Sequence, residues 1–457
     1  MGQASSLPER RLEPLVEAAM TVMTADRLTL RCRWLVTMAG PPLDNAWLVI
    51  ERGRIAAVGR RAPPGPAGQT IDLDDAIVLP GLVNAHTHLE FSELSQPLDT
   101  GGGLPAWITR VVAERQARLA GSEAGARADA AFRRGLAESA AAGVTTIGEI
   151  ATTARGVRGV RGTGFGPAAC GPRPAVRIFR EGLGLRPAAA ETVPRAVAAD
   201  LDRLAAAGIA TGVSPHAPYS VAAPLGRRLL AEAHRRRLPV AMHLLESVEE
   251  EELLATGGGP FRSLLEEFGA WDSAAPPTLL SPAEWIGRLA RATRGIVVHA
   301  THIRRDEAAL ARLARHRDRL AVAVCPRTTQ AISGMLPPLT ILREAGLRVA
   351  IGTDSRASNP DLSILAECRT LVAAGLSSPE EAVCMATVHG AWALAMEHRA
   401  GRIVAGRPAD LVILRSGVAA TGSGDLFAAA LDPATTVAAT LRRGRVIAGD
   451  LPGRLGV

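Results

Sequence analysis

The segment "IVLPGLVNAHTHLEFSEL", residues 77–94, decides the fold of this chain. It begins as a short apolar run of the kind that forms a buried strand, and the run ends in two histidines separated by one threonine. Residues i and i+2 of a strand point to the same side. We therefore expect His86 and His88 to converge on one point at the end of that strand.

Seven further short apolar runs follow, separated by helix-sized segments rich in Ala, Arg, Glu and Leu. These runs are "GVTTIGE", "AVRIFRE", "ATGVSPH", "LPVAMH", "GIVVHA", "LAVAVCP" and "LRVAIGTD". Eight strands that alternate with helices predict an α/β fold of the (β/α)8 TIM-barrel type. A doubly wound open sheet is the alternative. It needs a phosphate-binding loop, and the glycine-rich candidate at residues 156–172 runs into prolines instead of a helix.

The two ends of the chain show a different sequence pattern, which predicts short strands separated by turn residues at about 27–60 and again after 401. We expect both ends to form one small β-sandwich domain. The predicted division is an N-terminal extension (1–26), a first sandwich part (27–79), a metal-dependent barrel (80–400) and a second sandwich part (401–457). Residues 246–290 are interpreted as an insertion over the barrel mouth that acts as a lid.

Composition excludes several classes of protein. The chain has 47% hydrophobic and 21% charged residues and no run of ~20 apolar residues, so a soluble protein without a membrane span is expected. The N-terminus lacks the apolar core of a signal peptide, which predicts a cytoplasmic location. The net charge of +7 comes from arginines scattered among acids, and aromatic residues are only 3%, so no nucleic-acid partner is expected. A homodimer is compatible with an exposed barrel flank.

The chain contains no lysine, which excludes a Schiff-base lysine, a phosphate-loop lysine and a carboxylated lysine that bridges two metals. Its five cysteines are far apart and form no CxxC pair, which argues against a structural zinc site and a disulfide framework.

Polar residues stand where the predicted strands end, and most of the ten histidines are among them. Catalytic groups of TIM barrels gather at these ends. A single histidine at a strand end is commonly structural, but three imidazoles and a carboxylate together suit Zn²⁺ or Fe²⁺ and leave a position open for water. In chain order the residues are His86, His88, Glu149, Arg180, Glu181, His216, His243, Glu246, His299, His302, Cys325, Arg327 and Asp354.

These residues lie in the motifs "PGLVNAHTHLEFS", "GVTTIGE", "SPHAPYS", "AMHLLES", "VVHATHI", "CPRTTQ" and "GTDSRASNPDLSILAECRTL", followed by "GRIVAGRPADLVIL". The ordered set, across roughly residues 28–445, resembles the amidohydrolase superfamily. Within it the chain is most similar to adenosine-type and aminofutalosine-type deaminases and their chlorohydrolase relatives. "CPRTTQ" departs from the "HxPxSN"-like stretch more usual there, which leaves the contacts of the seventh strand open.

The resemblance implies one divalent metal, Zn²⁺ or Fe²⁺, bound by His86, His88, His243 and Asp354. It implies that Glu246 shuttles a proton, that His299 orients the attacking water, and that Asp354 also accepts the proton of that water. His216 of "HAPYS" is implied to contact the substrate. Since no lysine follows the fourth strand, a site for a single metal ion is implied.

We therefore expect a metal-dependent hydrolase of non-peptide carbon–nitrogen bonds that deaminates an adenine nucleoside of the aminodeoxyfutalosine, methylthioadenosine or S-adenosylhomocysteine type. A guanine, cytosine or triazine aminohydrolase, or a chlorohydrolase, uses the same groups and is the alternative. A barrel that keeps its metal for regulation or assembly predicts loss of Glu246 or Asp354, and both are present.

Substrate specificity is expected to come from the loops, with Trp107, Arg180, Arg327 and Trp285 as candidates. An arginine there would bind a substrate carboxylate through two hydrogen bonds, or would simply pair with local acids. The small-molecule substrate itself is not named by these residues.

Overall fold

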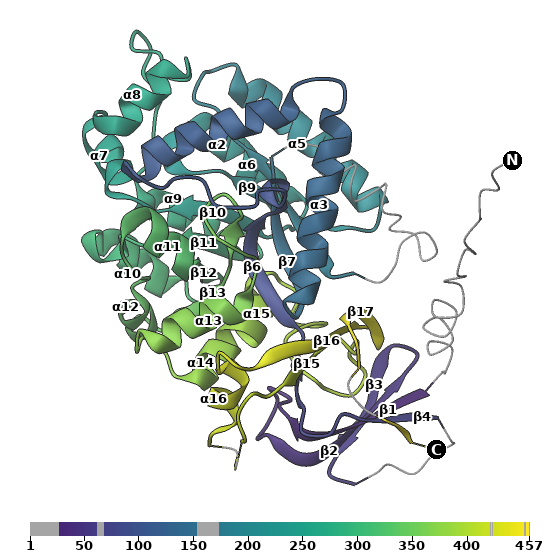
Figure 1. Ribbon diagram of the computed structural model, residues 1–457. Helices are drawn as coiled ribbons and strands as arrows, with labels where there is room; N and C mark the ends of the chain where they lie inside the picture. The colour runs from purple at the N-terminus through teal and green to yellow at the C-terminus, as the bar shows by residue number, and fades with distance from the viewer. Residues whose placement is uncertain are drawn as a thin grey trace, which may run out of the picture.

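The computed structural model describes residues 27–61, 68–152, 173–420, 422, 424–451 and 454–456. The predicted extension at 1–26 and the glycine-rich segment at 156–172 lie outside the described residues. The described chain forms two sheets, one surrounded by helices and one at the opposite end of the molecule near the C-terminus (Figure 1). In this part of the chain, no helix combines the length and the apolarity needed to cross a membrane.

The first sheet consists of parallel strands that are neighbours in chain order. They are β6 (Leu82–His88), β7 (Val144–Ala151), β8 (Ala175–Gly182), β9 (Ala210–Pro215), β10 (Val240–Leu244), β11 (Gly295–His299), β12 (Leu320–Val324) and β13 (Arg348–Ile351). A short strand, β14 (Asp354–Ser355), follows β13 and pairs with β6, so that Asp354 lies opposite Thr87. The last strand segment thus meets the first and closes the sheet, and the predicted TIM barrel is confirmed.

Most helices of the described chain lie around the barrel (Figure 1). They are α2 (Gly103–Leu119), α3 (Ala124–Ala141), α5 (Ala189–Ala206), α6 (Ala223–Arg235), α7 (Val248–Thr256), α8 (Gly259–Glu267), α9 (Pro282–Leu289), α10 (Glu307–Arg315), α11 (Pro326–Ser333), α12 (Leu339–Glu344), α13 (Ile364–Ala373), α14 (Pro379–Cys384), α15 (Gly390–Ala393) and α16 (Leu426–Leu431).

Alternation along the barrel strands separates two cores, because successive side chains of a strand face opposite sides. Ile178 and Met242 belong to the core under the helices, whereas their neighbours Phe179 and Ala241 belong to a second cluster with residues of most other barrel strands. That second cluster is the interior of the barrel. It is made mainly of small or branched side chains and fills the barrel below the mouth, as in other TIM barrels.

The second sheet is mixed and joins both ends of the chain, as predicted. Its strands are β1 (Arg27–Leu35), β2 (Leu43–Glu51), β3 (Arg54–Gly59), β4 (Gln69–Asp72), β5 (Ile77–Pro80), β15 (Leu411–Arg415), β16 (Thr436–Arg442), β17 (Arg445–Gly449) and β18 (Arg454–Gly456). The antiparallel pairing of β5 with β15 brings the two ends together. Buried aliphatic side chains from both ends form a core of its own here.

The segment at residues 77–88 turns out to be two strands, not one. Ile77–Pro80 belongs to the second sheet, and the barrel strand begins at Leu82. Gly81 lies between them, where a Cβ atom would come within 2.2 Å of the Thr145 side chain. Only glycine therefore fits at the point where the chain passes from one sheet to the other.

The predicted insertion at 246–290 is shorter than expected. α9 packs against β10 and β11 as an ordinary barrel helix, and only α7 and α8 are added at the mouth, beside α2 (Figure 1). Phe261 and Leu265 of α8 share a buried cluster with Trp107 of α2 and with Tyr219 after β9. The inserted helices are thus anchored to the loops at the barrel mouth.

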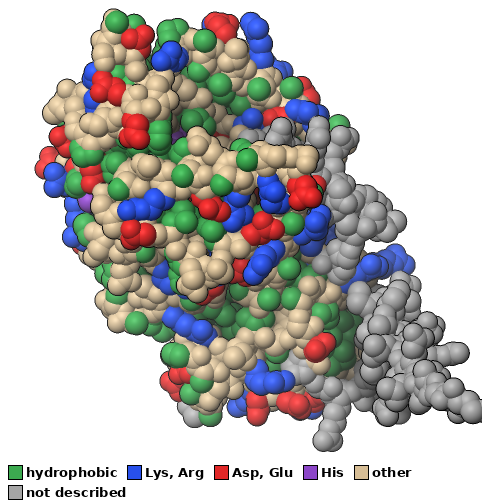
Figure 2. Space-filling model, turned by 45° about the horizontal axis from the view of Figure 1, so that its top comes forward, with side chains coloured by type: hydrophobic (Ala, Val, Ile, Leu, Met, Phe, Trp, Pro, Cys, Tyr) green, Lys and Arg blue, Asp and Glu red, His purple; other side chains and the backbone are tan. Residues whose placement is uncertain are grey.

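Arginines and acidic side chains are interspersed on the face of the molecule shown in Figure 2, where they do not gather into a single positive patch. This distribution agrees with the scatter of arginines along the sequence.

Candidate metal centre

Three imidazoles meet at the mouth of the barrel. His86 and His88 come from β6 and His243 from β10, and their ligand atoms all lie within 4.8 Å of one another. The Nε2 atoms of His88 and His243 are 3.4 Å apart. Oδ1 of Asp354 is 3.7 Å from Nε2 of His86 and 3.6 Å from Nε2 of His88. Tetrahedral ligands with bonds of about 2.1 Å are about 3.4 Å apart, so these spacings suit one bound cation.

Local backbone irregularity brings these groups together. The register between β6 and β7 shifts between Asn84 and Thr87, directly around His86, and a bulge of this kind re-aims side chains. Asp354 has a left-handed backbone with φ of 54°. Its carbonyl oxygen accepts a hydrogen bond of 2.6 Å from the Thr87 hydroxyl, which ties the ends of the first and last strand segments to each other.

The donor set fits a divalent cation. Both ring nitrogens of His86 and Nδ1 of His88 are buried without a hydrogen-bond partner in the described structure, which is costly unless something binds them. Burial lowers the pKa of His86 to about 3 and that of His88 well below its usual range. Nδ1 of His243 is 3.0 Å from the His216 carbonyl oxygen; donation there leaves Nε2 free as the ligand. Neutral imidazoles with an oriented lone pair are the form that binds metal.

A second pair of polar groups lies beside the first. Oε1 of Glu246 is 3.3 Å from Nε2 of His299, and both side chains are buried. Burial, and then the charge of Asp354, raise the pKa of Glu246 well above its usual range, while burial lowers the pKa of His299. Both shifts favour the uncharged form, and a protonated carboxyl and a neutral imidazole can respectively donate a proton and orient a water molecule.

The loop that carries Glu246 is held by another buried carboxylate. Oε1 of Glu250 accepts a 3.0 Å hydrogen bond from the backbone N–H of Leu245, and Oε2 accepts one of 3.0 Å from that of Glu246. Leu245 has a positive φ of 56°. Glu250 therefore fixes a strained turn between the metal-ligand candidate His243 and the acid Glu246.

Comparison with known proteins is consistent with this site. A model of the family described as "Amidohydrolase family" matches residues 77–448 of the chain. The chain belongs to the amidohydrolase family. It is accordingly a hydrolase of a metal-dependent family, and the three imidazoles are its candidate metal site.

Several relatives of this amidohydrolase carry the name 5-methylthioadenosine/S-adenosylhomocysteine deaminase. The protein from Halobacterium salinarum is 29% identical over 384 residues, which cover 80% of this chain and 78% of the relative. The one from Syntrophobacter fumaroxidans is 30% identical over 408 residues, covering 82% and 81% of the two chains.

Solved structures share the fold of this amidohydrolase. Aminofutalosine deaminase of Helicobacter pylori, in complex with methylthio-coformycin, has a TM-score of 0.76 and 22% identity and covers 92% of this chain and 100% of that one. Atrazine chlorohydrolase of Arthrobacter aurescens, complexed with zinc, has a TM-score of 0.71 and 19% identity and covers 94% and 97%.

Of the expected substrate-contacting residues of the amidohydrolase, His216 lies beside the candidate metal centre and Trp107 contacts the loop of a candidate ligand. The His216 ring centroid is 5.0 Å from that of His243, and its Nδ1 is 2.5 Å from the Ser220 hydroxyl. Trp107 is buried in the cluster beneath α7 and α8, and its Nε1 donates a 3.2 Å hydrogen bond to the carbonyl of Ala357. Ala357 follows Asp354 by three residues, so Trp107 anchors α2 to the loop of the candidate ligand.

Arg180 does not face the mouth. It alternates with Phe179, which points into the barrel, and its Nε donates a 2.7 Å hydrogen bond to Asp200 on the outer helix α5. The guanidinium is thus engaged on the outside of the barrel. The expected contact of Arg180 with a substrate carboxylate finds no support in this arrangement, since strand alternation turns Glu181, not Arg180, toward the site.

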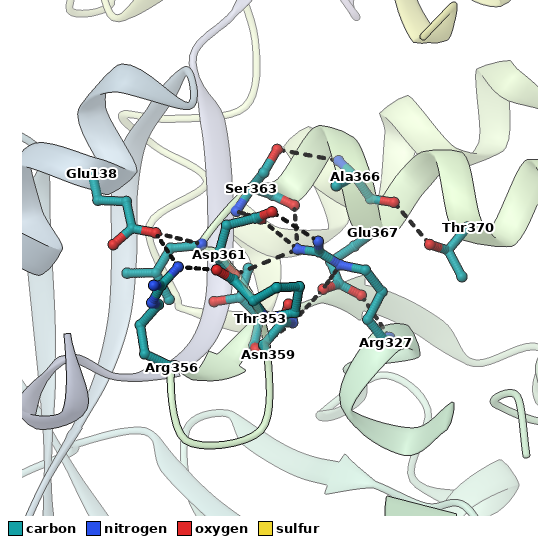
Figure 3. A network of polar contacts seen from close by, with 12 residues as sticks. Glu138, Arg327, Thr353, Arg356, Asn359, Asp361, Ser363, Ala366, Glu367 and Thr370 are labelled. Atoms are coloured by element: carbon teal, nitrogen blue, oxygen red, sulfur yellow. Dashed lines mark hydrogen bonds and ion pairs between the residues drawn. The ribbon is translucent and has the colours of Figure 1, made fainter. Parts of the chain in front are cut away.

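Arg327 is also engaged within the protein (Figure 3). It pairs with Asp361 at 2.6 Å and with Glu367 at 2.8 Å, and Glu367 additionally accepts a hydrogen bond from the Arg327 backbone N–H. Its donors are therefore committed to holding the loop after β14 against α11, and the expected contact with a substrate carboxylate finds no support in this arrangement.

Trp285 is a core residue and not a specificity residue. Its ring is fully buried in α9, and a Cβ atom on Gly226 of α6 would come within 2.1 Å of it. The ring thus fills the space between two barrel helices.

Residues that sequence reasoning missed lie directly behind the predicted ones. Glu250 holds the loop of Glu246, and the Ser358 hydroxyl donates a 2.7 Å hydrogen bond to Oδ2 of Asp354. The hydroxyl of Thr328 in turn lies 2.9 Å from that of Ser358. The sequence shows that Glu250 follows Glu246, and Ser358 follows Asp354, by four residues. The local sequence pattern does not reveal that the members of each pair are in contact.

Proposed function

We propose that this amidohydrolase deaminates an adenine nucleoside by hydrolysis, with one divalent cation, Zn²⁺ or Fe²⁺, bound by His86, His88, His243 and Asp354. The observation that carries the proposal is the pairing of Glu246 with His299 at 3.3 Å, directly beside this ligand set. A proton donor and a water-orienting imidazole next to a cation site are what hydrolytic deamination requires.

When bound, the cation would supply a water molecule that ionises near neutral pH. Asp354 accepts the proton that this water loses. Its Oδ1 is the oxygen nearest the imidazoles, and we assign the proton to Oδ2, which also receives a hydrogen bond from Ser358. Nε2 of His299 orients the attacking oxygen. Glu246 donates its proton to the ring nitrogen adjacent to the amino-bearing carbon as the new carbon–oxygen bond forms. Asp354 then protonates the leaving amine and ammonia departs. The hydroxyl left on the ring becomes a carbonyl as its proton passes to Glu246, which restores both acidic residues.

The names of the relatives support the substrate class. Relatives of 29–30% identity are named for deamination of methylthioadenosine and S-adenosylhomocysteine, and a structural neighbour for deamination of aminofutalosine. The engaged state of Arg180 and Arg327 leaves neither of them as the carboxylate-binding group that aminodeoxyfutalosine or S-adenosylhomocysteine would need. Methylthioadenosine has no carboxylate and appears in the names of these relatives, and it is the substrate that we favour.

The test is ammonia release by purified, metal-loaded protein from a panel of adenosine, methylthioadenosine, S-adenosylhomocysteine, aminodeoxyfutalosine, guanine, cytosine and an aminotriazine. Turnover of adenine nucleosides, with methylthioadenosine the best substrate, is expected. Turnover confined to guanine, cytosine or the triazine would overturn the nucleoside proposal and leave the hydrolase standing. A preference for the carboxylate-bearing nucleosides would overturn only the favoured substrate.

A further inference from the structure

A buried carboxylate of the barrel mouth has no role in the chemistry above. Glu181 stands two residues after Phe179 on β8, so its side chain faces the barrel interior like the phenyl ring. The residue is only 2% exposed, and Oε1 is fully buried without a hydrogen-bond partner in the described structure. An unpartnered buried carboxylate is costly and needs an explanation.

No arginine forms an ion pair with this carboxyl group in the described chain, although Arg115 and Arg180 are close enough to act on it electrostatically. Arg180 is turned outward to Asp200. Arg115 is the other arginine close to it, and its guanidinium is held by Glu90 through two hydrogen bonds of 3.1 and 2.8 Å. Within the residues described, Glu181 takes part in no ion pair, so its acceptor capacity is left open toward the mouth.

The neighbours of Glu181 belong to the wall that a substrate would touch. Ser214 on β9 is its register partner, is fully buried, and also has a hydroxyl without a hydrogen-bond partner. His216 follows two residues later. The ligand-type atoms of Glu181, His216 and His243 all lie within 4.8 Å of one another.

The spacing of this second group suits a hydroxyl group better than a metal ion. The carboxylate has no imidazole nitrogen within 4.0 Å in the described chain, yet lies within 4.8 Å of two. Ligands of a tetrahedral zinc ion are about 3.4 Å apart. Two groups hydrogen-bonded at about 2.8 Å to one hydroxyl oxygen are about 4.5 Å apart, which falls between the 4.0 Å and 4.8 Å limits found here.

We infer that Glu181 is a specificity-determining residue that accepts hydrogen bonds from the ribose hydroxyls of the nucleoside, with His216 as its neighbour on the same hydroxyl. This inference rests on the proposed function. A carboxylate has two acceptor oxygens and no donor, which matches a pair of adjacent hydroxyls, and an acidic side chain bound to ribose hydroxyls is common in nucleotide-binding proteins. A nucleoside that lacks the hydroxyl leaves the carboxylate buried and unpaired.

The experiment compares Glu181→Gln and Glu181→Ala with the wild type on the best adenine ribonucleoside and on its 2′-deoxy and 3′-deoxy forms. Loss of a hydrogen bond to a charged group should lower kcat/KM for the ribonucleoside about 10- to 100-fold in the alanine variant. For the wild type, kcat/KM on one of the deoxy forms should be reduced to a similar extent. The variants should show nearly the same kcat/KM on that deoxy form as on the ribonucleoside. Metal content and melting temperature should stay close to those of the wild type.

The matched control is Glu191→Gln, which removes the same charge from an exposed glutamate of the same strand–helix unit and should leave kcat/KM unchanged. If the Glu181 variants lose kcat/KM equally on the ribonucleoside and on both deoxy forms, the inference is overturned. Turnover by the wild type would still uphold the proposed function. Loss of bound metal in either Glu181 variant would also overturn it, since the residue would then be a metal ligand. Wild-type inactivity on every adenine nucleoside would overturn the proposed function and the inference together.

Discussion

Oε1 of Glu246 lies 3.3 Å from Nε2 of His299, although the two residues come from different strand ends of the barrel. The pair joins a carboxyl with a raised pKa to an imidazole with a lowered one, and in both cases burial is the main cause. Both shifts favour the uncharged form of the group.

Glu246→Gln keeps the shape of the side chain and removes the transferable proton. We expect kcat to fall about 10²- to 10⁴-fold, with bound metal per chain unchanged, because Glu246 is not among the proposed ligands. Steady-state ammonia release and elemental analysis measure the two quantities. Glu252→Gln, an exposed change on the same helix α7, is the control and should retain full activity; a Glu246→Gln variant that keeps most of its turnover would remove Glu246 from the mechanism.

Chelation should abolish turnover, and Zn²⁺ or Fe²⁺ should restore it. His88→Ala should lose bound metal, because the Nε2 pair of His88 and His243 at 3.4 Å forms one edge of the site. The bound cation stabilises the folded state, so chelation should also lower the melting temperature of the wild type but not that of His88→Ala. Metal analysis with paired thermal melts checks this, and full metal occupancy in His88→Ala would contradict the ligand set.

Ser358→Ala removes the 2.7 Å hydrogen bond to Oδ2 of Asp354. A hydrogen bond to a charged group contributes about 1.5–3 kcal/mol, so a fall in kcat of at least about 10-fold is expected, with a smaller change in KM. Ser358→Thr retains the hydroxyl and should recover part of the loss. If Ser358→Ala shifts KM alone, the hydroxyl contacts substrate and does not orient Asp354.

Glu250 predicts a pH dependence of stability. Burial raises the pKa of its carboxyl from the ordinary 4.5 to about 7. The folded state therefore binds more protons than the unfolded state between these values, and the free energy of unfolding falls as pH rises through the window. Glu250→Gln removes this titration. The free energy of unfolding of the variant should therefore fall less steeply with pH than that of the wild type, by up to about 1.4 kcal/mol per pH unit. Urea unfolding from pH 4.5 to 7.5 measures the slope, and parallel curves for the two proteins would contradict the assignment.

Trp285→Ala tests the distinction between core and mouth. Removing a fully buried tryptophan ring costs about 3–5 kcal/mol, so the free energy of unfolding should drop by that amount. KM of the folded variant should remain that of the wild type, because the ring lies between α6 and α9. A change in substrate preference would return Trp285 to the specificity residues.

Most of the barrel was predictable because its signal is local. Each strand is a short apolar run followed by a helical segment, and all eight runs became strands. The join at Gly81 was not predictable in this way, because the apolar run continues through it and only contact with Thr145 separates two sheets.

The limits at the site are of the same kind. The strand-end rule brought out both Arg180 and Glu181, but the choice between them depends on which face of β8 points inward. The orientation of β8 is set by Phe179, which packs in the barrel interior, and by Asp200, which binds Arg180 from a helix twenty residues further along the chain. Glu250 and Ser358 were missed because each acts through a contact made only after folding. Glu250 accepts a hydrogen bond from the backbone N–H of Leu245, and Ser358 donates one to the Asp354 carboxylate.

The hydrogen bond between Thr87 and Asp354 joins residues 267 positions apart, across the line where the barrel closes. Two of the proposed ligands come from one side of that seam and one from the other. A cation held there would link the first and the last strand segments of the barrel. A nascent chain that still lacks its eighth barrel strand could not assemble the complete ligand set. The complete metal site would therefore form only once the barrel has closed.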